Sequence, residues 1–322
     1  MISNRMILAI SCAVILSGCA VIYCFDNNNY GVSIEVREGK VDYSITGFMP
    51  CDYTYRVYSG ADVPERIYLY FDSSYANYYD IGNLNRAAND IEKILKDRGF
   101  ESFKRVDANN LKKLMDDPSK AIGSLLIFLN GTIPDTIYDG TSMRLTEWMD
   151  NGGSVVWAGP EIGLLVSHTY GYEMAENGRL FKGHINDGKE QDIQSISEMG
   201  EITGFSLYNC IPYGLEKDYP GSMCLSTCSS DYSSASVMSY SNGRIYIIGG
   251  NMTNNVLPLL TSMAEMMICG INENTILKST ETFHKGYGNI SGTFDTSVSS
   301  GDVLLLTIGK PYSSWARAFV IP

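Results

Sequence analysis

The middle of the chain alternates between short apolar runs and amphipathic segments. The runs predicted as strands are 66–71, 100–106, 123–129, 154–158 and 243–250. The segments that repeat apolar residues at helical spacing are 87–98, 107–115, 141–150 and 256–269. Residues 72–85, rich in Tyr and Asn, are predicted as a long loop. Strands and helices that alternate in this way predict an α/β fold with a doubly wound, mostly parallel sheet.

Both ends of the chain alternate apolar and polar residues with a period of two. Residues 32–36 and 41–45 flank a Glu-Gly-Lys turn, which predicts a β-hairpin. Further strand-like runs lie at 53–58, 290–298, 303–308 and 316–321. We expect the hairpin and the tail to pair as one small β module. The predicted domains are an anchor or signal at 1–25, a β segment at 26–62, an α/β domain at 63–271 and a β segment at 272–322.

The amino-terminal residues 6–25 contain no charged side chain and are long enough to span a bilayer as a helix. Arg5 precedes this run and Asp26 follows it, so the positive-inside rule puts the bulk of the chain outside the cytoplasm. The Leu-Ser-Gly-Cys sequence that ends at Cys19 resembles the lipobox of bacterial lipoproteins. Residues 1–25 are therefore interpreted as a transmembrane signal anchor, a lipoprotein signal or a cleaved secretory signal. We expect a cell-membrane protein that is single-pass or lipid-anchored.

Composition and charge limit the kinds of molecule that the chain is expected to bind. A formal net charge of -12 and a pI near 4.7 argue against nucleic-acid binding, which needs clustered Lys and Arg. Tyr outnumbers Phe by 22 to 11, which indicates aromatic side chains at wet surfaces. Cys210, Cys224 and Cys228 lie close enough in sequence for one disulfide, but no further ligands complete a zinc site. We expect no metal and no cofactor.

Three consecutive segments resemble a known superfamily. They read GSLLIFLNGTIPD, LTEWMDNGG and SVVWAGPEIG between residues 123 and 163, and GRIYIIGGN follows at 243–251. The order is a buried strand, a Gly-containing loop, a helix ending in Gly-Gly, and a strand that enters a sharp turn. It resembles class I glutamine amidotransferase-like domains, including the ThuA-like branch, over about residues 66–270. The resemblance implies a flavodoxin-like or amidotransferase-like α/β domain.

The resemblance also implies a degenerate member that has lost the Cys-His pair. Active members carry Gly-x-Cys-x-Gly at the turn, with a base that keeps the thiol deprotonated. Here the turn runs from Gly159 to Gly163 and places Glu161 at the nucleophile position. The later strand ends at Gly249 and leads to Asn251, where the superfamily has its His. On this alignment, thiol-based amide hydrolysis is excluded.

Polar side chains follow the predicted parallel strands at the sheet edge where α/β proteins bind ligands. The candidate ligand-binding residues are Asp72, Tyr75, Tyr78, Asn130, Glu161 and Asn251. Glu161 would begin a helix whose amino end stabilises its charge, and with Asp72 it could form a catalytic or metal-binding carboxylate pair. Alternatively, Glu161 caps that helix and Asp72 caps its own loop. The tyrosines could stack on a sugar or pack on a neighbouring loop.

Other polar residues are expected to be structural. His168 and His184 are predicted to be surface or core side chains rather than catalytic groups. Asn130, Asn251 and Asn289 begin glycosylation sequons, a number that arises by chance in a chain of this composition.

Three functions therefore remain open from the sequence. The main hypothesis is ligand binding or scaffolding at the cell surface by a domain without thiol catalysis. One alternative is a hydrolase that acts on carbohydrate or a related polar ligand with Glu161 as acid and base. The other is a structural envelope protein that interacts through its β module.

Overall fold

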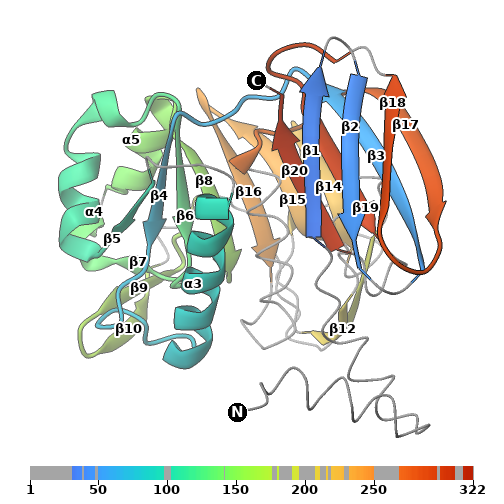
Figure 1. Ribbon diagram of the computed structural model, residues 1–322. Coiled ribbons are helices and arrows are strands. Elements are labelled where there is room, and N and C mark those ends of the chain that lie inside the picture. The colour runs from blue at the N-terminus through green and yellow to red at the C-terminus, as the bar shows by residue number, and fades with distance from the viewer. Residues whose placement is uncertain are drawn as a thin grey trace, which may run out of the picture. The chain divides into compact units, whose positions relative to one another are not determined.

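A computed structural model describes residues 31–37, 40–47, 50–97, 103–140, 142–175, 180, 191–195, 207–210, 215–216, 219–227, 232–249, 268–295, 298–308 and 315–321. The chain forms two compact units (Figure 1). Unit 1 comprises Met1–Tyr53 and Thr282–Ser299, and unit 2 comprises Thr54–Glu281 and Ser300–Pro322. The helices predicted at 6–25 and over most of 256–269 lie outside the described residues. Within the described ranges, no helix is long and apolar enough to cross a membrane.

Unit 2 is built around a large mixed sheet of order β12-β11-β14-β15-β16-β8-β6-β4-β5, with β13 paired to β15. Neighbouring strands run parallel through one half of it. These strands are β4 (Arg66–Tyr70), β5 (Phe103–Val106), β6 (Ser124–Phe128), β8 (Ser154–Gly159) and β16 (Gly243–Gly249). In this half, β4 is flanked by β5 and β6, and β8 and β16 follow beyond β6. That is the flavodoxin-like order, so the predicted parallel arrangement is confirmed for this half.

The other half of the large sheet is antiparallel, so the expectation of a mostly parallel sheet is wrong there. Its strands are β11 (Gln191–Ser195), β12 (Leu207–Cys210), β13 (Leu215–Glu216), β14 (Ser222–Thr227) and β15 (Tyr232–Tyr240). β15 reaches β16 through a two-residue turn with Ser241 at φ 50. Antiparallel neighbours need only such short connections, whereas parallel ones need a crossover that is usually a helix.

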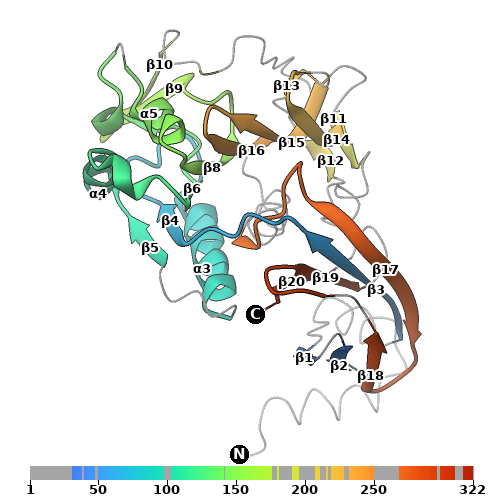
Figure 2. The same ribbon diagram turned by 90° about the horizontal axis from the view of Figure 1, so that it is seen from above.

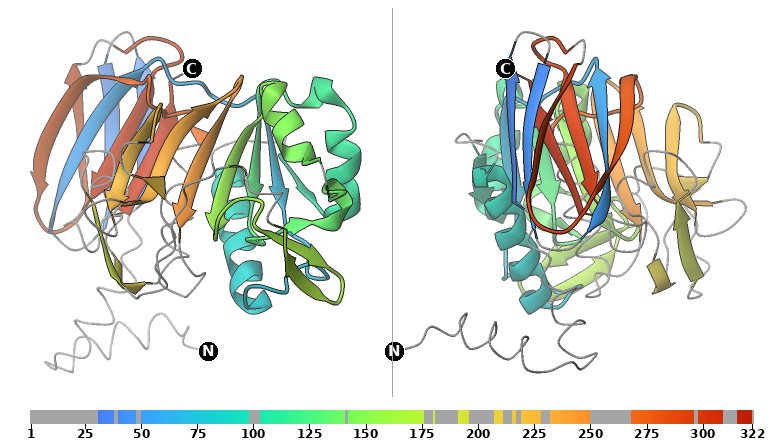
Figure 3. Two further views of the ribbon diagram at one scale, coloured as in Figure 1. Left: turned by 180° about the vertical axis from the view of Figure 1, so that it is seen from behind. Right: turned by 45° about the vertical axis from the view of Figure 1, so that its right-hand side comes forward.

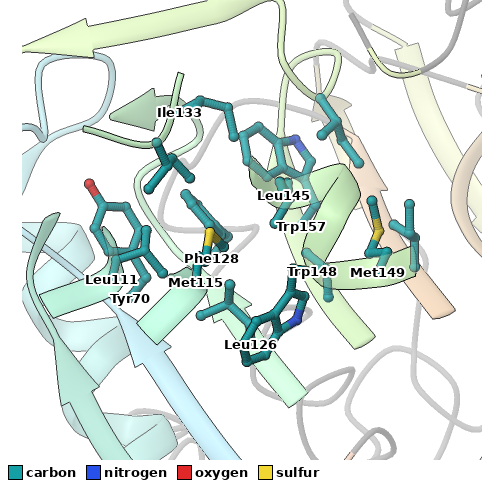
Figure 4. Packing of buried hydrophobic residues seen from close by; sticks show 14 of the residues in the cluster. Tyr70, Leu111, Met115, Leu126, Phe128, Ile133, Leu145, Trp148, Met149 and Trp157 are labelled. Carbon is teal, nitrogen blue, oxygen red and sulfur yellow. The ribbon is translucent and has the colours of Figure 1, made fainter. Parts of the chain in front are cut away.

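Helices cover both faces of the parallel half, as the doubly wound prediction requires (Figure 2). α3 (Ile81–Asp97) packs on one face, where its Leu84, Ile91 and Leu95 side chains are fully buried against β4, β6 and β8. α4 (Ala108–Met115) and α5 (Arg144–Asp150) pack on the other face. Figure 4 shows this second core, in which the Phe128 ring lies 4.5 Å from Tyr70 and 5.3 Å from Trp157.

The start of α3 differs from the prediction. The helix begins at Ile81, inside the stretch predicted as a loop, because Asp80 acts as its cap. Asp80 Oδ1 accepts the Asn83 N–H at 2.9 Å, and the Asp80 carbonyl accepts the Leu84 N–H at 3.1 Å. The start of α4 was predicted correctly, with the Asp107 side chain accepting the Asn110 N–H at 2.7 Å.

Short elements complete unit 2 at the carboxyl ends of its parallel strands. A separate sheet of order β10-β9-β7 contains β7 (Ile133–Pro134), β9 (Leu165–His168) and β10 (Gly171–Met174). β9 and β10 form an antiparallel hairpin, and β7 pairs with β9 in parallel. Of the two 3-10 turns, η2 (Asp135–Ile137) follows β7 at this edge, whereas η1 (Pro118–Lys120) precedes β6 at its amino end.

Unit 1 contains a three-stranded antiparallel sheet of order β1-β2-β18. Its strands are β1 (Gly31–Arg37), β2 (Lys40–Thr46) and β18 (Ile290–Asp295). β2 buries Val41, Tyr43 and Ile45 alternately, which confirms the period-two prediction. β2 pairs with β18 along its length, so the expected pairing with the hairpin is confirmed for the first strand of the tail. The later tail strands join a different sheet, so the single module expected from the hairpin and the whole tail is wrong.

The remaining strands form a four-stranded sheet of order β17-β3-β19-β20 (Figure 3). They are β3 (Cys51–Ser59), β17 (Ile276–Lys285), β19 (Val303–Ile308) and β20 (Trp315–Val320). The division between the two units falls inside β3 and β17. The predicted domain limits of 62 and 271 stay predictions.

Candidate functional site

Three parallel strands of unit 2 end at one edge of the sheet. β4 leads to Asp72, β6 leads to Asn130, and β8 leads to the turn that holds Glu161. The chain continues from β4 to β5 on one side and later returns to β6 on the other, so the strand order reverses between β4 and β6. Ligands of open α/β sheets bind at such a reversal, at the carboxyl ends of the strands.

Asp72 and Asn130 join the loops that follow β4 and β6. Asn130 Nδ2 donates to the Asp72 carbonyl at 2.9 Å, and the Asp72 N–H donates to Asn130 Oδ1 at 3.4 Å. The Asp72 carboxylate accepts the N–H groups of Ser74 at 2.9 Å and of Ala108 at 3.0 Å. Asn130 is fully buried. Both side chains therefore hold main-chain groups in place, which favours the capping interpretation of Asp72.

Tyr79 packs between the loops that follow β6 and β8. Gly131 adopts a φ of +69, and a Cβ there would overlap the Tyr79 ring. A Cβ on Gly159, whose φ is +147, would lie 2.8 Å from Tyr79 Oη and 2.9 Å from the Gly131 Cα. Glycine is required at both positions for this close approach as well as for the positive φ.

Glu161 lies in a tight turn between β8 and β9. The Leu164 N–H donates to the Glu161 carbonyl at 3.1 Å, and Trp157 Nε1 donates to the Pro160 carbonyl at 2.7 Å. The Glu161 residue is only 6% exposed. Gly163 at φ 81 then redirects the chain into β9. The helix expected after this turn is therefore wrong, and Glu161 has no helix amino end to stabilise its charge.

A cluster of charged side chains surrounds His168 at the end of β9. Asp135 Oδ2, on η2, lies 2.6 Å from His168 Nδ1, and Glu173 Oε1, on β10, lies 3.3 Å from Nε2. The hydrogen bond that His168 donates to the Asp135 carboxylate outweighs partial burial and raises the pKa of His168, and Glu173 adds to this effect. The Tyr170 ring stacks on the imidazole at 5.2 Å with an interplanar angle of 5°.

Two tyrosine hydroxyls at this edge remain protonated at neutral pH. Burial raises the pKa of Tyr70 well above its ordinary range, and the negative charge of Asp72 adds to the effect. Burial also raises the pKa of Tyr75, together with the charge of Asp135 and a hydrogen bond to that carboxylate. The loop after β4 therefore places the Tyr75 hydroxyl near Asp135 of the His168 cluster.

The loop after β4 also contacts the β9–β10 hairpin directly. Asn77 Nδ2 donates to the His168 carbonyl at 2.6 Å and to the Gly171 carbonyl at 3.3 Å. The Tyr78 ring meets Tyr79 edge-on at 4.7 Å and Tyr172 edge-on at 5.5 Å. Of the predicted candidates, Tyr78 therefore lies against the hairpin and Tyr75 lies near Asp135, whereas Asp72 and Asn130 join to each other.

Sequence reasoning missed the members of this cluster. Asp135, Tyr170 and Glu173 were not singled out, and His168 was assigned to a structural role. His168 and Asp135 are 33 residues apart in the chain, so no local spacing links them. The candidate Asn251 lies outside the described residues, as do His184 and the side chains of Cys210 and Cys228. Among the described side chains, no group of three or more His, Cys, Asp or Glu is arranged to hold a metal ion.

Comparison with known proteins assigns no family. No family model matches the chain, and no curated protein matches it. A cold-adapted β-galactosidase from Rahnella sp. R3 is similar in structure at a TM-score of 0.36 and 12% identity. The match covers 73% of this chain and 42% of the enzyme, so the chain spans less than half of that relative.

Two further solved structures show likenesses of the same size. A ThuA-like protein from Bacteroides uniformis has a TM-score of 0.36 and 13% identity, over 66% of this chain and 95% of that one. An exo-β-1,4-mannosidase from Opitutaceae bacterium strain TAV5 has a TM-score of 0.36 and 15% identity, over 64% and 34% respectively. Likenesses at these scores carry no functional argument.

Proposed function

We propose that this chain is a membrane-anchored, extracytoplasmic protein whose amidotransferase-like α/β unit binds a hydroxyl-rich ligand, such as a sugar, without thiol catalysis. The uncharged run at 6–25 supports the anchor and the outside location, with a lipid on Cys19 as the alternative anchor. The turn with Glu161 at the expected position of a cysteine supports the absence of thiol chemistry.

The observation that carries the binding proposal is the exposure of aromatic side chains on the β9–β10 hairpin. Tyr170 is 85% exposed and Tyr172 is 48% exposed. Among the described residues, three of the seven exposed large hydrophobic side chains belong to this hairpin, namely Tyr170, Tyr172 and Met174. Asp135 and Glu173 add carboxylates around His168, on which the Tyr170 ring stacks. Sugars present apolar faces that stack on aromatic rings and hydroxyl groups that bond to carboxylates.

The surroundings of Glu161 and Asp72, the two candidate catalytic carboxyl groups, favour binding over hydrolysis. Glu161 is buried, whereas a general acid must reach the atom to which it transfers a proton. Asp72 uses both carboxylate oxygens to accept main-chain N–H groups. Neither arrangement resembles a pair of carboxylates that flanks a scissile bond.

The proposal is tested by calorimetric titration of the full-length chain in mild detergent. The probes are maltotetraose, cellotetraose, mannotetraose and chitotetraose. We expect at least one probe to bind, and the Tyr170→Ala variant to bind it about tenfold more weakly because a stacking ring is lost. Tyr287→Ala is the matched control, because Tyr287 is a 72% exposed tyrosine in unit 1 and should leave binding unchanged.

The same samples separate the alternative functions. If the probes are shortened by the wild type and not by Glu161→Gln, the protein is a hydrolase and the binding proposal is wrong. If no probe binds and none is cleaved, a structural envelope role replaces it.

A further inference from the structure

The imidazole of His168 lies between two carboxylates that belong to different elements. Asp135 comes from η2, 2.6 Å from Nδ1, and Glu173 comes from β10, 3.3 Å from Nε2. Glu173 is itself in the hairpin, opposite Val166 of β9. His168 thus links β10, which carries Tyr172 and Glu173, to η2, which follows β7.

The protonation state of His168 decides how many of these contacts can persist. A charged imidazolium attracts both carboxylates, Asp135 through a hydrogen bond at Nδ1 and Glu173 through an ion pair at Nε2. A neutral imidazole donates from one nitrogen and presents a lone pair at the other. The contact with Asp135 is shorter, and the Asp135 side chain is 38% exposed against 70% for Glu173. The neutral ring therefore keeps its proton toward Asp135 and turns its lone pair toward the Glu173 carboxylate, which is repelled into solvent.

We propose that the β9–β10 hairpin is a proton-controlled ligand surface, held in place when His168 is charged and released at Glu173 when His168 is neutral. The Tyr170 ring stacks on the imidazole, so it follows the state of the ring. Tyr172 precedes Glu173 directly in β10 and packs on Tyr78. Release of Glu173 therefore disturbs the tyrosine side chains that are proposed to bind the ligand. Only the effect on ligand binding rests on the proposed function, whereas the response of the hairpin to the proton does not.

The groups that face His168 set the direction of the response. Asp135 and Glu173 are the charged groups around the ring, and the Tyr75 hydroxyl, whose pKa is raised, lies near Asp135. Asn77 contacts only the His168 carbonyl, so it does not titrate with the ring. The pKa of His168 is raised in the folded chain. The stabilisation of the hairpin by charged His168 is therefore fully present below about pH 6.5, and it is lost as the pH rises through the pKa of His168 in the folded chain.

The hairpin can be followed without any ligand, by amide hydrogen exchange of the full-length chain. Protection factors for 165–174 are compared at about pH 6 and about pH 9, after correction for the intrinsic rate, on either side of the His titration. We expect wild-type protection to be about fivefold higher at the lower pH, as fits a partly exposed charge contact. His168→Gln should remove this difference. Glu173→Gln, at an exposed position, should also remove most of this difference, because it lacks the carboxylate that the charged ring holds.

A hairpin with equal protection at both pH values, or with the same pH dependence in His168→Gln, overturns the inference. The ligand arm repeats the titration of the four tetraoses at both pH values. Weaker binding at the higher pH in the wild type alone supports the coupling, and equal binding at both refutes it. If no tetraose binds at either pH, the proposed function fails, and the exchange result still decides whether the hairpin responds to the proton.

Discussion

Replacing Asn130 with alanine tests whether the Asp72–Asn130 contact holds this sheet edge together. The fully buried Asn130 side chain makes two hydrogen bonds, of 2.9 Å to the Asp72 carbonyl and of 3.4 Å from the Asp72 N–H. The substitution removes both bonds. A buried polar group without its partner costs about 1–3 kcal/mol, and the longer bond contributes least. We expect a loss of about 2–3 kcal/mol of unfolding free energy for Asn130→Ala, or about 5–10 °C in Tm for a unit of this size.

Differential scanning calorimetry of the full-length chain measures this shift. Asn85→Ala is the matched control, since Asn85 is exposed on α3 and accepts only a 3.4 Å hydrogen bond from Arg105. Asn130→Asp is diagnostic, because it keeps an acceptor for the Asp72 N–H and replaces the donor to the Asp72 carbonyl with a repelling oxygen. A Tm for Asn130→Ala equal to that of Asn85→Ala would refute the reasoning.

Two further substitutions test packing and charge. Gly131→Ala should destabilise the chain far more than Gly140→Ala in thermal melts, because both glycines have positive φ but only the first meets the Tyr79 ring. Glu273→Gln should lose a partly buried ion pair with Arg244, whose Nε lies 3.0 and 3.1 Å from the two carboxylate oxygens. Burial opposes ionisation, but hydrogen bonds from neighbouring groups including Arg244 hold the pKa of Glu273 below its ordinary value. The contribution of Glu273 to the free energy of unfolding is therefore present above about pH 4.3, and it is lost as the pH falls through the pKa of Glu273 in the folded chain. Urea melts should show wild type and variant converging in acid, and a gap that persists there would contradict the assignment.

The sequence predicted the elements whose pattern is local. The strands at Arg66–Tyr70, Ser124–Phe128 and Ser154–Gly159 are nearly continuous apolar runs, because both of their faces are buried under helices. The β2 strand alternates because only one face is buried. Asp107 identified the start of α4 through its cap. Each of these signals lies within one segment, so no knowledge of the fold is needed to find it.

The elements that were missed depend on contacts between distant segments. The turn after β8 was expected to lead into a helix, but pairing of β9 with β7 and β10 makes the segment a strand. The same pairing brings His168 to Asp135, from another loop. Glu173 was passed over because a charged residue on a short exposed strand resembles any solvated position. Tertiary pairing, which a local pattern does not contain, decided both the strand and the site.

The central claim is that the ligand surface is the β9–β10 hairpin and not the turn around Glu161. A crystal structure of the full-length chain with the tightest-binding tetraose tests it most directly. We expect a sugar ring stacked on Tyr170 or Tyr172 with its hydroxyl groups at Glu173 or Asp135. A sugar bound beside Glu161, with the hairpin tyrosines bare, would contradict it.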